Sequence, residues 1–477
     1  MPELKPGFIA NMCALLGEEA GAFFRALEEA PSLALRPHRG MEAAKPFIEA
    51  AVPWAAGGFY LRPGARPGAS VAHWAGAFYL QEASAMLPAA ALGARPGERV
   101  LDLCAAPGGK SSQIALALGG EGVLVANEVD ASRARALAAN LERLGVRNAV
   151  VLNETPARLA ERWPGYFDAV LVDAPCSGEG MFRREPQSRE AWTDAAPRGC
   201  AKRQADILAA AAKLVRPGGR LLYSTCTFNG EENEGSVADF LQHHADFSPE
   251  EFALPGLGAS HGGMLHIWPH RARGDGQFAA LLRRAGKNAG DVFMRVDGAD
   301  GSGTQAPAHP AADIEVWLEA LSKARPARRA GKTAPAQDAA ALLRALGKCA
   351  VAALPISPQS ARLRLEGRRL FAVPLDAPEL DGLRVLSPGL ALLRAETGRV
   401  EPEHALAMAL LPGMASREAA LTEKEALAFI AGEALPREGE AGWALVTHAG
   451  LPLGWGKQAG GMLKNHVPKG LRARLHP

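Results

Sequence analysis

The chain has 477 residues, of which 48% are hydrophobic, and 53 Lys and Arg side chains against 51 Asp and Glu give a net charge of +2. This length predicts two to four domains, and the apolar content is sufficient to bury a core in each of them. Because the charge is nearly balanced, a nucleic-acid partner would have to be bound by local basic patches.

The six cysteines, at positions 13, 104, 176, 200, 226 and 349, are scattered along the chain. No two of them have Cys-x-x-Cys spacing, so we expect no zinc or other metal site. Scattered cysteines in a chain of this length also make a poor disulfide framework, which indicates a reducing compartment. The N-terminus has no signal-peptide pattern, and no run of about 18 apolar residues occurs. We therefore expect a cytoplasmic protein with no membrane span.

Residues 1–75 are expected to form a small N-terminal unit. Within it, the spacing of apolar residues over 8–27 predicts one amphipathic helix. From 76 to 286 the pattern alternates between strands, over 99–103, 122–128, 148–153, 167–175 and 220–226, and helices over 111–118, 131–145 and 204–215. Alternation with short links predicts a catalytic unit of the α/β class, built on a parallel, doubly wound sheet.

Residues 287–340 are rich in Gly, Ala, Pro and Arg and are expected to form a flexible linker. The basic run at 323–332 is interpreted as solvated linker, with RNA contact as the alternative. A first C-terminal unit is expected over 341–412, with a hairpin over 362–375 that turns at Glu366 and Gly367.

A second C-terminal unit is expected over 413–477, with a pair of short strands within 442–457. No Asp or Glu occurs from Ala441 to Pro477, whereas Lys and Arg occur at 457, 464, 469, 472 and 474. A small β unit with charges of one sign is suited to a phosphate backbone, so we expect this unit to bind RNA.

The stretch LDLCAAPGGKSSQ, residues 101–113, follows the first strand of the catalytic unit. Its GGKS matches the end of a phosphate-binding loop, but Cys104 stands where that loop needs its first glycine. The small residues at positions 105, 106, 108 and 109 let the backbone approach a ligand closely. Glu128, at the end of the second strand, is placed to accept hydrogen bonds from ribose hydroxyls.

Two interpretations of this loop compete. One is an ATPase, in which AVLVD, residues 169–173, supplies the Asp that holds magnesium. The other is a methyltransferase, in which the loop binds a nucleoside cofactor and Glu128 binds its ribose. Cys104 argues against the ATPase.

Two further cysteines follow two later strands. Cys176 lies in DAPCSGEGMFRRE after the fourth strand, and Cys226 lies in YSTCTFNGEENE after the fifth. Because parallel strands end at one edge of a sheet, both thiols are expected beside the cofactor loop. Two thiols at one site indicate nucleophilic chemistry. A redox pair is the weaker alternative, because Cys-x-x-Cys spacing is missing.

With these motifs the chain resembles the RNA cytosine-C5 methyltransferases of the Nop/Sun type. The stretches LDLCAAPGGK, DAPCSGEGMFR and YSTCTFNGEENE carry the likeness, together with GAFYLQEASAM (76–86) and HIWPHRARGDGQFAALLRR (266–284). The stretch LPLGWGKQAGGMLKNHVPKGLR (451–472) resembles the PUA-like tail of the bacterial RsmF-like branch, which acts on small-subunit rRNA. The resemblance is dense over about 70–285, clear near 450–472 and thin elsewhere.

The resemblance implies a Rossmann-like class I methyltransferase core with small N-terminal and PUA-like C-terminal RNA-binding domains, and S-adenosylmethionine as the cofactor. It makes Cys226 the nucleophile that attacks cytosine C6, and Cys176 the residue that assists product release. Asp173 would hydrogen-bond the N3 edge of the base, with Lys110 nearby. The implied cofactor-binding residues are Cys104, Ala105, Ala106, Pro107, Gly108, Gly109, Lys110, Glu128 and Asp173.

The expected substrate is therefore 16S small-subunit rRNA. A tRNA cytosine-C5 methyltransferase is one alternative, and a nucleotide-dependent RNA-binding protein or ATPase is the alternative from another class. No obligate protein partner is evident, and we expect a monomer. The chain departs from the family pattern at Thr155, next to Glu154, where an acid often contacts adenine, and at His38, where Asn is more frequent.

Overall fold

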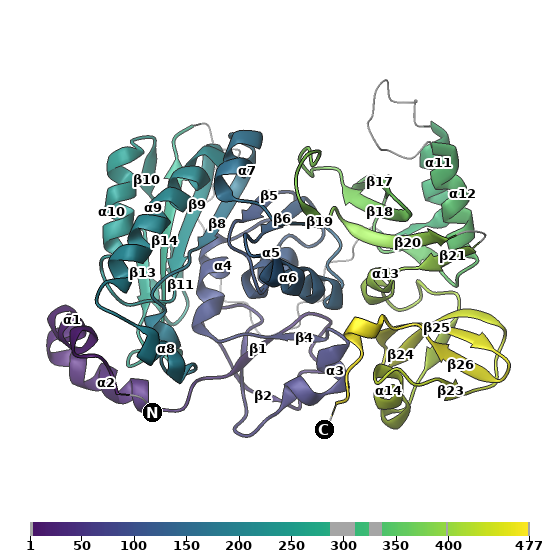
Figure 1. Ribbon diagram of the computed structural model, residues 1–477, viewed down its shortest axis with the longest axis horizontal. Coiled ribbons are helices and arrows are strands. Elements are labelled where there is room, and N and C mark those ends of the chain that lie inside the picture. Colours follow the sequence, from purple (N-terminus) through teal and green to yellow (C-terminus); the bar gives the residue numbers. More distant parts are fainter. Residues whose placement is uncertain (1–2, 287–310, 324–335, 397–398, 476–477) are drawn as a thin grey trace.

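The computed structural model describes residues 3–286, 311–323, 336–396 and 399–475. A large mixed sheet forms the centre of the molecule, with the N-terminal helices at one end and the two C-terminal units at the other (Figure 1). None of the helices in these ranges is long and apolar enough to cross a membrane.

Five parallel strands form the middle of this sheet, as the sequence predicts. In spatial order they are β9 (Val215–Thr225), β8 (Phe167–Asp173), β5 (Arg99–Asp102), β6 (Val123–Asn127) and β7 (Ala149–Leu152). Their apolar side chains are divided between two large buried clusters, one on each face of the sheet. Strands buried on both faces have nearly continuous apolar sequences, which is why they could be recognised from the sequence.

Four antiparallel strands extend the sheet on the two sides of its parallel core. The sequence predicted parallel strands only, and this prediction is wrong for the outer strands. They are β14 (Gln277–Arg284) beside β9, β13 (Met264–Ile267) and β10 (Phe247–Pro249) beside β14, and β19 (Val385–Ser387) beside β7. The last of these comes from the first C-terminal unit, so two units share one sheet. An antiparallel edge on a parallel core is common, but local sequence patterns do not indicate it.

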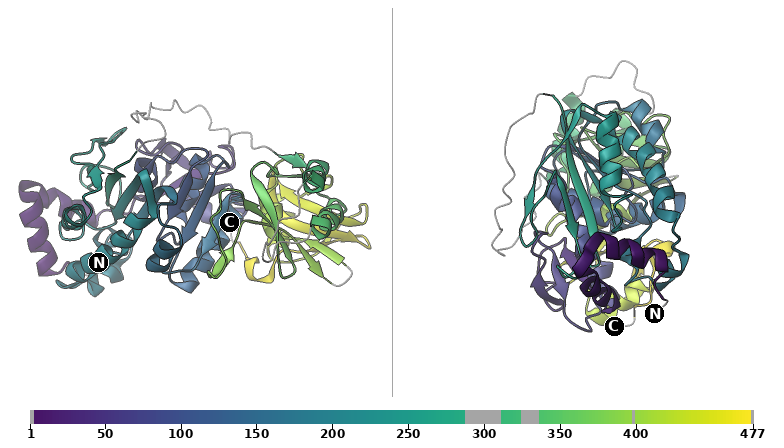
Figure 2. Two further views of the ribbon diagram at one scale, coloured as in Figure 1. Left: turned by 90° about the horizontal axis from the view of Figure 1, so that it is seen from above. Right: turned by 90° about the vertical axis from the view of Figure 1, so that its left-hand side faces the viewer.

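Helices cover both faces of the sheet, which makes it doubly wound as expected (Figure 2). One face carries α4 (Leu87–Leu92), α5 (Gly109–Ala117) and α6 (Ala131–Arg143), and the other carries α7 (Pro156–Arg162), α9 (Ala196–Leu214) and α10 (Glu234–His243). The expected helices at 111–118 and 131–145 are confirmed. Helix α9 begins at Ala196 instead of at 204.

Two helices occupy the start of the N-terminal unit, where one was expected over 8–27. Helix α1 (Pro6–Leu16) ends at Gly17, whose φ of 53° lies in the region that favours glycine, and α2 (Ala20–Glu28) follows a short turn. A four-stranded sheet follows, in the order β2 (Ile48–Ala51), β3 (Phe59–Leu61), β1 (Ala34–Pro37), β4 (Phe78–Leu80), and α3 (Val71–Trp74) precedes β4.

The first C-terminal unit begins inside the expected linker. Residues Ala312–Asp313 form β15, Ile314–Lys323 form α11 and α12 (Ala336–Gly347) begins before 340, so these parts of 287–340 are structured and not a linker. Much of the stretch at 298–312 and of the basic run at 323–332 lies outside the described residues.

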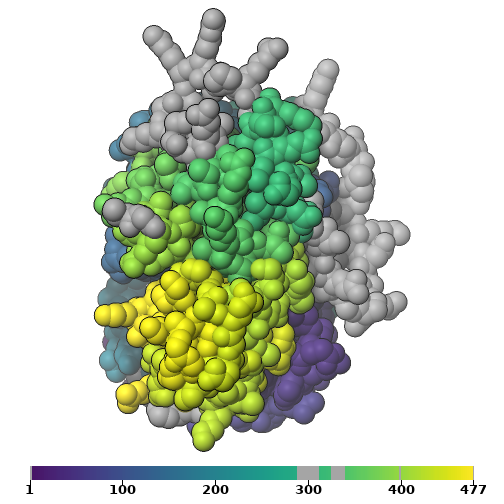
Figure 3. Space-filling model, turned by 90° about the vertical axis from the view of Figure 1, so that its right-hand side faces the viewer, coloured from purple at the N-terminus to yellow at the C-terminus, as the bar shows by residue number. Residues whose placement is uncertain are grey.

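The remaining strands of the C-terminal units form two small sheets, apart from β16 (Ala353–Leu354), which pairs with β15. Figure 3 shows the first unit, in green, in contact with the second, in yellow. The first sheet consists of β17 (Ala361–Glu366), β18 (Arg369–Pro374), β20 (Leu390–Glu396) and β21 (Arg399–Pro402), followed by α13 (His404–Ala409). The second contains β22 (Glu418–Ala420), β24 (Gly442–His448), β25 (Leu451–Ala459), β26 (Met462–Asn465) and β23 (Leu435–Pro436), with α14 (Glu423–Ile430). Both predicted strand pairs are present.

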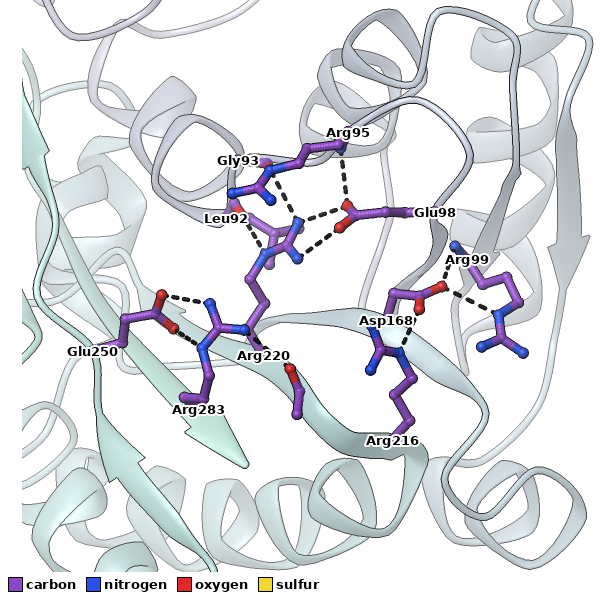
Figure 4. Close-up of polar contacts among 11 residues, drawn as sticks. Leu92, Gly93, Arg95, Glu98, Arg99, Asp168, Arg216, Arg220, Glu250 and Arg283 are labelled. Carbon is purple, nitrogen blue, oxygen red and sulfur yellow. Dashed lines mark hydrogen bonds and ion pairs between the residues drawn. The ribbon is translucent and has the colours of Figure 1, made fainter. Parts of the chain in front are cut away.

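Ion pairs occupy the edge of the central sheet where the parallel strands begin (Figure 4). The Arg220 guanidinium donates to both carboxylate oxygens of Glu98, at 2.8 and 2.6 Å, and to the carbonyls of Leu92 and Gly93. Asp168 accepts from Arg99 and Arg216. Side chains of this edge are therefore paired with one another, and the opposite edge carries the motifs that the sequence singles out.

Candidate active site

The cofactor loop connects the end of β5 to the start of α5. Gly108, the residue before the helix, has φ of 110°, and a Cβ there would lie 3.1 Å from Cδ1 of Leu137. A side chain at this position is therefore disfavoured both by the backbone and by the neighbour. The peptide bond between Ala106 and Pro107 is cis.

A buried arginine from the N-terminal unit holds the start of α5. This residue was not among the site residues predicted from the sequence. Arg36 in β1 is 2% exposed, and its Nη2 donates to the carbonyl of Gly109 at 3.0 Å and to Oγ of Ser112 at 2.7 Å. The only sequence signal is a charged residue in an otherwise apolar strand. The contact means that the N-terminal unit takes part in shaping the cofactor loop.

Two buried carboxylates lie at the ends of β5 and β6. Asp102 accepts from Ser111 through Oδ2 at 2.6 Å, whereas its Oδ1 is buried without a hydrogen-bond partner. Burial raises the pKa of Asp102 to about 7. Glu128 accepts from the backbone of Asp130, and its buried Oε2 makes no hydrogen bond and lies 3.5 Å from Nη1 of Arg133.

These orphaned oxygens fit S-adenosylmethionine, which brings ribose hydroxyls and an ammonium group that need acceptors. Cys104, between them, is suited to a passive role: burial and the neighbouring carboxylates raise its pKa well above the usual range of a thiol, so it stays neutral. A neutral thiol next to a cofactor fills space and does not compete as a nucleophile.

Thr155 and Glu154, where the chain departs from the family pattern, both make structural contacts. Thr155 Oγ1 caps α7 by accepting from the backbone of Arg158. The Glu154 side chain, 1% exposed, accepts from the backbone N–H of Arg384 at 2.8 Å, and its carboxylate lies within ion-pair distance of two arginines. Glu154 thus binds the segment that leads into β19.

The two cysteines predicted to meet at this edge do so. The Sγ atoms of Cys176, after β8, and Cys226, after β9, lie 3.3 Å apart, and both are free thiols. The hydrogen bond with Cys226 and burial raise the pKa of Cys176 well above its ordinary value. Cys176 is therefore a thiol that can donate its S–H toward Cys226.

Asp173, at the end of β8, accepts hydrogen bonds through both oxygens. Lys110 Nζ donates to Oδ2 at 2.6 Å, and Nε2 of Gln277 donates to Oδ1 at 3.2 Å. Although burial opposes it, the charge of Asp173 and its hydrogen bond raise the pKa of Lys110. Gln277 lies in β14 and also donates to Ser224 Oγ, so its part in the site depends on a strand that the sequence analysis did not predict.

A set of hydrogen bonds fixes the two cysteine loops to each other. The backbone N–H of Gly180 donates to the carbonyl of Cys226 at 2.8 Å, and the Glu179 carboxylate accepts from the backbone N–H groups of Phe228 and Asn229 at 2.9 and 3.0 Å. Glu179 is 0% exposed, and burial raises its pKa. We call these contacts the loop bracket.

A second acid completes the loop bracket. The carboxylate of Glu232 accepts from the backbone N–H of Ser177 at 3.0 Å, and Oγ of Ser177 lies 2.8 Å from Oγ1 of Thr227. The sequence did signal these residues, because the acids lie within the quoted motifs SGEGMF and NGEENE. Only the fold shows that they connect one cysteine loop to the other.

The N-terminal helices pack on the outside of these loops. Phe8 and Phe23 form one aromatic cluster with Phe182 and Trp192, from the segment after β8, and Phe228, from the loop after β9. The site is therefore built from the catalytic unit with support from the N-terminal unit.

Successive parts of the chain match four protein families, and all four families are named for rRNA methyltransferases of the RsmB/F or RsmF kind. Residues 89–283 match 16S rRNA methyltransferase RsmB/F, and residues 4–83 match the N-terminal domain of 16S rRNA methyltransferase RsmF. Residues 349–410 match the first C-terminal domain of the RsmF rRNA methyltransferase, and residues 416–473 match the RsmF PUA domain.

Three individual relatives share the same protein name. Ribosomal RNA small subunit methyltransferase F of Vibrio cholerae is 32% identical over 432 residues, covering 88% of this chain and 85% of that one. The Escherichia coli protein of the same name is 33% identical over 441 residues, covering 88% and 84%. The Serratia proteamaculans protein is 39% identical over 243 residues, which are 49% of this chain and 51% of that one.

Solved structures match the catalytic part. A methyltransferase homolog protein from Pyrococcus horikoshii is 31% identical with a TM-score of 0.50, covering 58% of this chain and 94% of that one. NSun6 from the same organism, solved with SFG, is 21% identical with a TM-score of 0.51, covers 59% and 99%, and shares the fold. The sequence, the site geometry and these matches agree: the chain belongs to the ribosomal RNA small subunit methyltransferase F family of S-adenosylmethionine-dependent rRNA methyltransferases.

Proposed function

We propose that the protein methylates C5 of a cytosine in 16S rRNA through a covalent bond between Cys226 and C6 of the base. The observation that carries this proposal is the pair of thiols, 3.3 Å apart, at the edge of the sheet that also holds the cofactor loop. A methyltransferase that acts on oxygen or nitrogen needs no thiol nucleophile, and therefore no second thiol beside it.

The proposed reaction begins when the Cys226 thiolate adds to C6, which makes C5 electron-rich. Asp102, Glu128 and the cofactor loop would hold S-adenosylmethionine, which would supply an electrophilic methyl group to C5 and leave as a neutral thioether. Water takes the C5 proton, the electron pair of that bond returns to the ring, the C6–S bond breaks, and the sulfur leaves as the thiolate. Cys176, whose raised pKa keeps its proton, supports this departure by donating its S–H to the developing Cys226 anion.

Asp173 is proposed to hold the target base by its N3 edge: the carboxylate accepts from the N4 amino group, and N3 can donate to it once addition at C6 has made the ring basic enough to take a proton from water. Lys110 and Gln277 hold one carboxylate oxygen each, so the group is oriented before substrate arrives. Preorganised polar groups of this kind stabilise a transition state because they need no reorganisation during the reaction. The target cytosine must leave its stack to reach this edge, so we expect a flipped or looped-out base.

The second C-terminal unit is proposed to bind the RNA backbone. Lys457 and Lys464 face each other across the β25–β26 pair, and Lys457 lies over the ring of Trp443, 5.3 Å from its centre. Like charges directly opposite each other destabilise a sheet, so this arrangement is consistent with an anionic partner.

The test uses single alanine variants of the two cysteines with labelled cofactor and three RNAs: 16S rRNA, assembled small subunits and tRNA. Cys226→Ala should abolish methyl transfer, because no adduct can form. Cys176→Ala should accumulate a protein–RNA adduct that survives a denaturing gel. Cys13→Ala, which changes an exposed cysteine of α1, is the matched control.

An adduct formed by the Cys226 variant would reverse the two roles. Methyl transfer at full rate by both variants would reject covalent catalysis while leaving the family assignment intact. Methylation of tRNA in preference to both forms of rRNA would reject the proposed substrate.

A further inference from the structure

A cavity of about 230 Å³ lies where the N-terminal unit, the catalytic unit and both C-terminal units meet, away from the cysteines and the cofactor loop. The segment after β1, His38 to Gly40, lines one side, and the segments that follow α5 and α6 line another. The end of α13 and the turn between β24 and β25 complete it. We call it the junction cavity. None of its lining residues takes part in the proposed methyl transfer.

The charged groups that line the junction cavity are all cationic. They are Arg39 and Arg147, and no Asp or Glu side chain is among the described residues that line the cavity. Arg39 Nη2 donates to the carbonyls of Leu144 and Met408, and Arg147 Nη1 donates to the carbonyl of Pro355 at 2.8 Å. Carbonyls are neutral, so neither guanidinium has a counter-charge among the ion pairs of the described residues.

Unused donors remain beside these contacts. Nε of Arg39 and Nδ1 of His38 are buried atoms without a hydrogen-bond partner among the described residues. The pKa of His38 is held well below its ordinary value, by burial first and then by four arginines, Arg39 and Arg147 among them. Burial together with neighbouring arginines lowers the pKa of Arg39 to about 10, and burial alone does the same for Arg147.

Arg39 and Arg147 are partly buried. Charge withdrawn from water without a counter-charge is costly, and proteins normally pair it or give it a ligand. The wall of the cavity offers guanidinium groups, which suit the oxygens of phosphate. The cavity volume is several times the volume of about 30 Å³ that one water occupies in the liquid, so a tetrahedral anion and several waters fit.

We propose that the junction cavity is a binding site for a phosphate group, held by Arg39 and Arg147 with His38 beside them. The phosphate is either a phosphodiester of bound RNA or a free inorganic ion, because the two present the same oxygens. In either case the anion would lie between the N-terminal unit, the catalytic unit and both C-terminal units. This inference does not depend on the chemistry at the cysteines.

The first experiment measures binding of inorganic phosphate to the full chain by titration calorimetry, and its effect on Tm against sodium chloride of equal ionic strength. Wild type should bind one phosphate, with Tm higher by about 2–4 °C near saturation. Arg147→Gln should lose the response and Arg147→Lys should keep part of it. Lys213→Gln, which removes an exposed charge on α9, should respond as wild type does.

The Tm without phosphate separates a ligand site from a structural contact. If Arg147 only supports the Pro355 carbonyl, Arg147→Gln lowers Tm equally with and without phosphate, and the proposal is rejected. If the cavity holds an anion, the variant changes Tm little in chloride, since a repulsive charge is removed along with the hydrogen bond. Failure of wild type to bind phosphate also rejects the proposal.

RNA binding identifies the source of the phosphate. If RNA supplies it, Arg147→Gln should reduce the slope of log affinity against log salt by about 1, and inorganic phosphate should compete with RNA for wild type. If the ion is free, calorimetric binding remains while the salt slope of the variant is unchanged. Both results support a phosphate site, and they differ only in where the phosphate comes from.

Discussion

The loop bracket predicts that Glu179 controls the rate of methyl transfer without touching the substrate. Its carboxylate accepts the backbone N–H groups of Phe228 and Asn229, just after Cys226 in the chain, and the indole N–H of Trp192 at 3.1 Å. In Glu179→Ala these donors remain buried but have no acceptor. Each unpaired donor costs about 1–3 kcal/mol of folding free energy. The two backbone donors alone give a loss of about 2–6 kcal/mol in the free energy of unfolding.

The effect on rate follows from the effect on geometry. Without the bracket, Cys226 is no longer fixed relative to Cys176 and the cofactor loop, and a displacement of about 1 Å in a reacting group costs on the order of a hundredfold in rate. We expect Glu179→Gln, which keeps one acceptor oxygen, to be the better-folded variant. It should lower kcat by about tenfold to a hundredfold with little change in KM for RNA.

The assay is transfer of labelled methyl to 16S rRNA, with denaturant unfolding of the same samples. Glu190→Gln, an exposed acid on α8 (Pro186–Ala191), controls for the change of charge. If Glu179→Gln is destabilised as calculated but keeps the wild-type kcat, the bracket supports the fold alone and the reasoning on rate is refuted.

Three further predictions concern other parts of the chain. Each contact with a single-stranded phosphate adds about 0.7 to the slope of log affinity against log salt. Replacing Lys457 and Lys464 together by Gln should therefore lower that slope by about 1.4, measured by filter binding. The pKa of Glu142 is raised to about 7 by burial and Glu403, so its stabilising contribution is present below pH 4.5 and is lost as pH rises through 7. Glu142→Gln should therefore be more stable than wild type at pH 8, by about 1–3 kcal/mol, with the difference gone below pH 4.5 in denaturant titrations. Arg220→Met should cost about 3 kcal/mol in unfolding free energy by leaving Glu98 unpaired, and adding Glu98→Leu should recover much of it.

The sequence by itself determined the parallel core and the meeting of the two thiols. Apolar strands with helices between them can pair in parallel, and strand polarity then brings every carboxyl end to one edge. Cys176, Cys226 and the cofactor loop each follow a strand directly, so their proximity was fixed by local position. The place of the small C-terminal strand pairs could be predicted for a similar reason, since a turn and its flanking strands are adjacent in sequence.

The tertiary structure alone decided the contacts that orient these groups. Gln277 reaches Asp173 from β14, which pairs antiparallel with β9, and Arg36 reaches Gly109 from another unit. Glu154 meets the backbone of Arg384, 230 residues away in the chain. Side chains so far apart in sequence leave no periodic pattern, because what places them together is the burial of whole units against one another. The junction cavity is of the same kind, since nothing in the local sequence of its arginines sets them apart from surface charges, and only the packing of four units places them at a cavity.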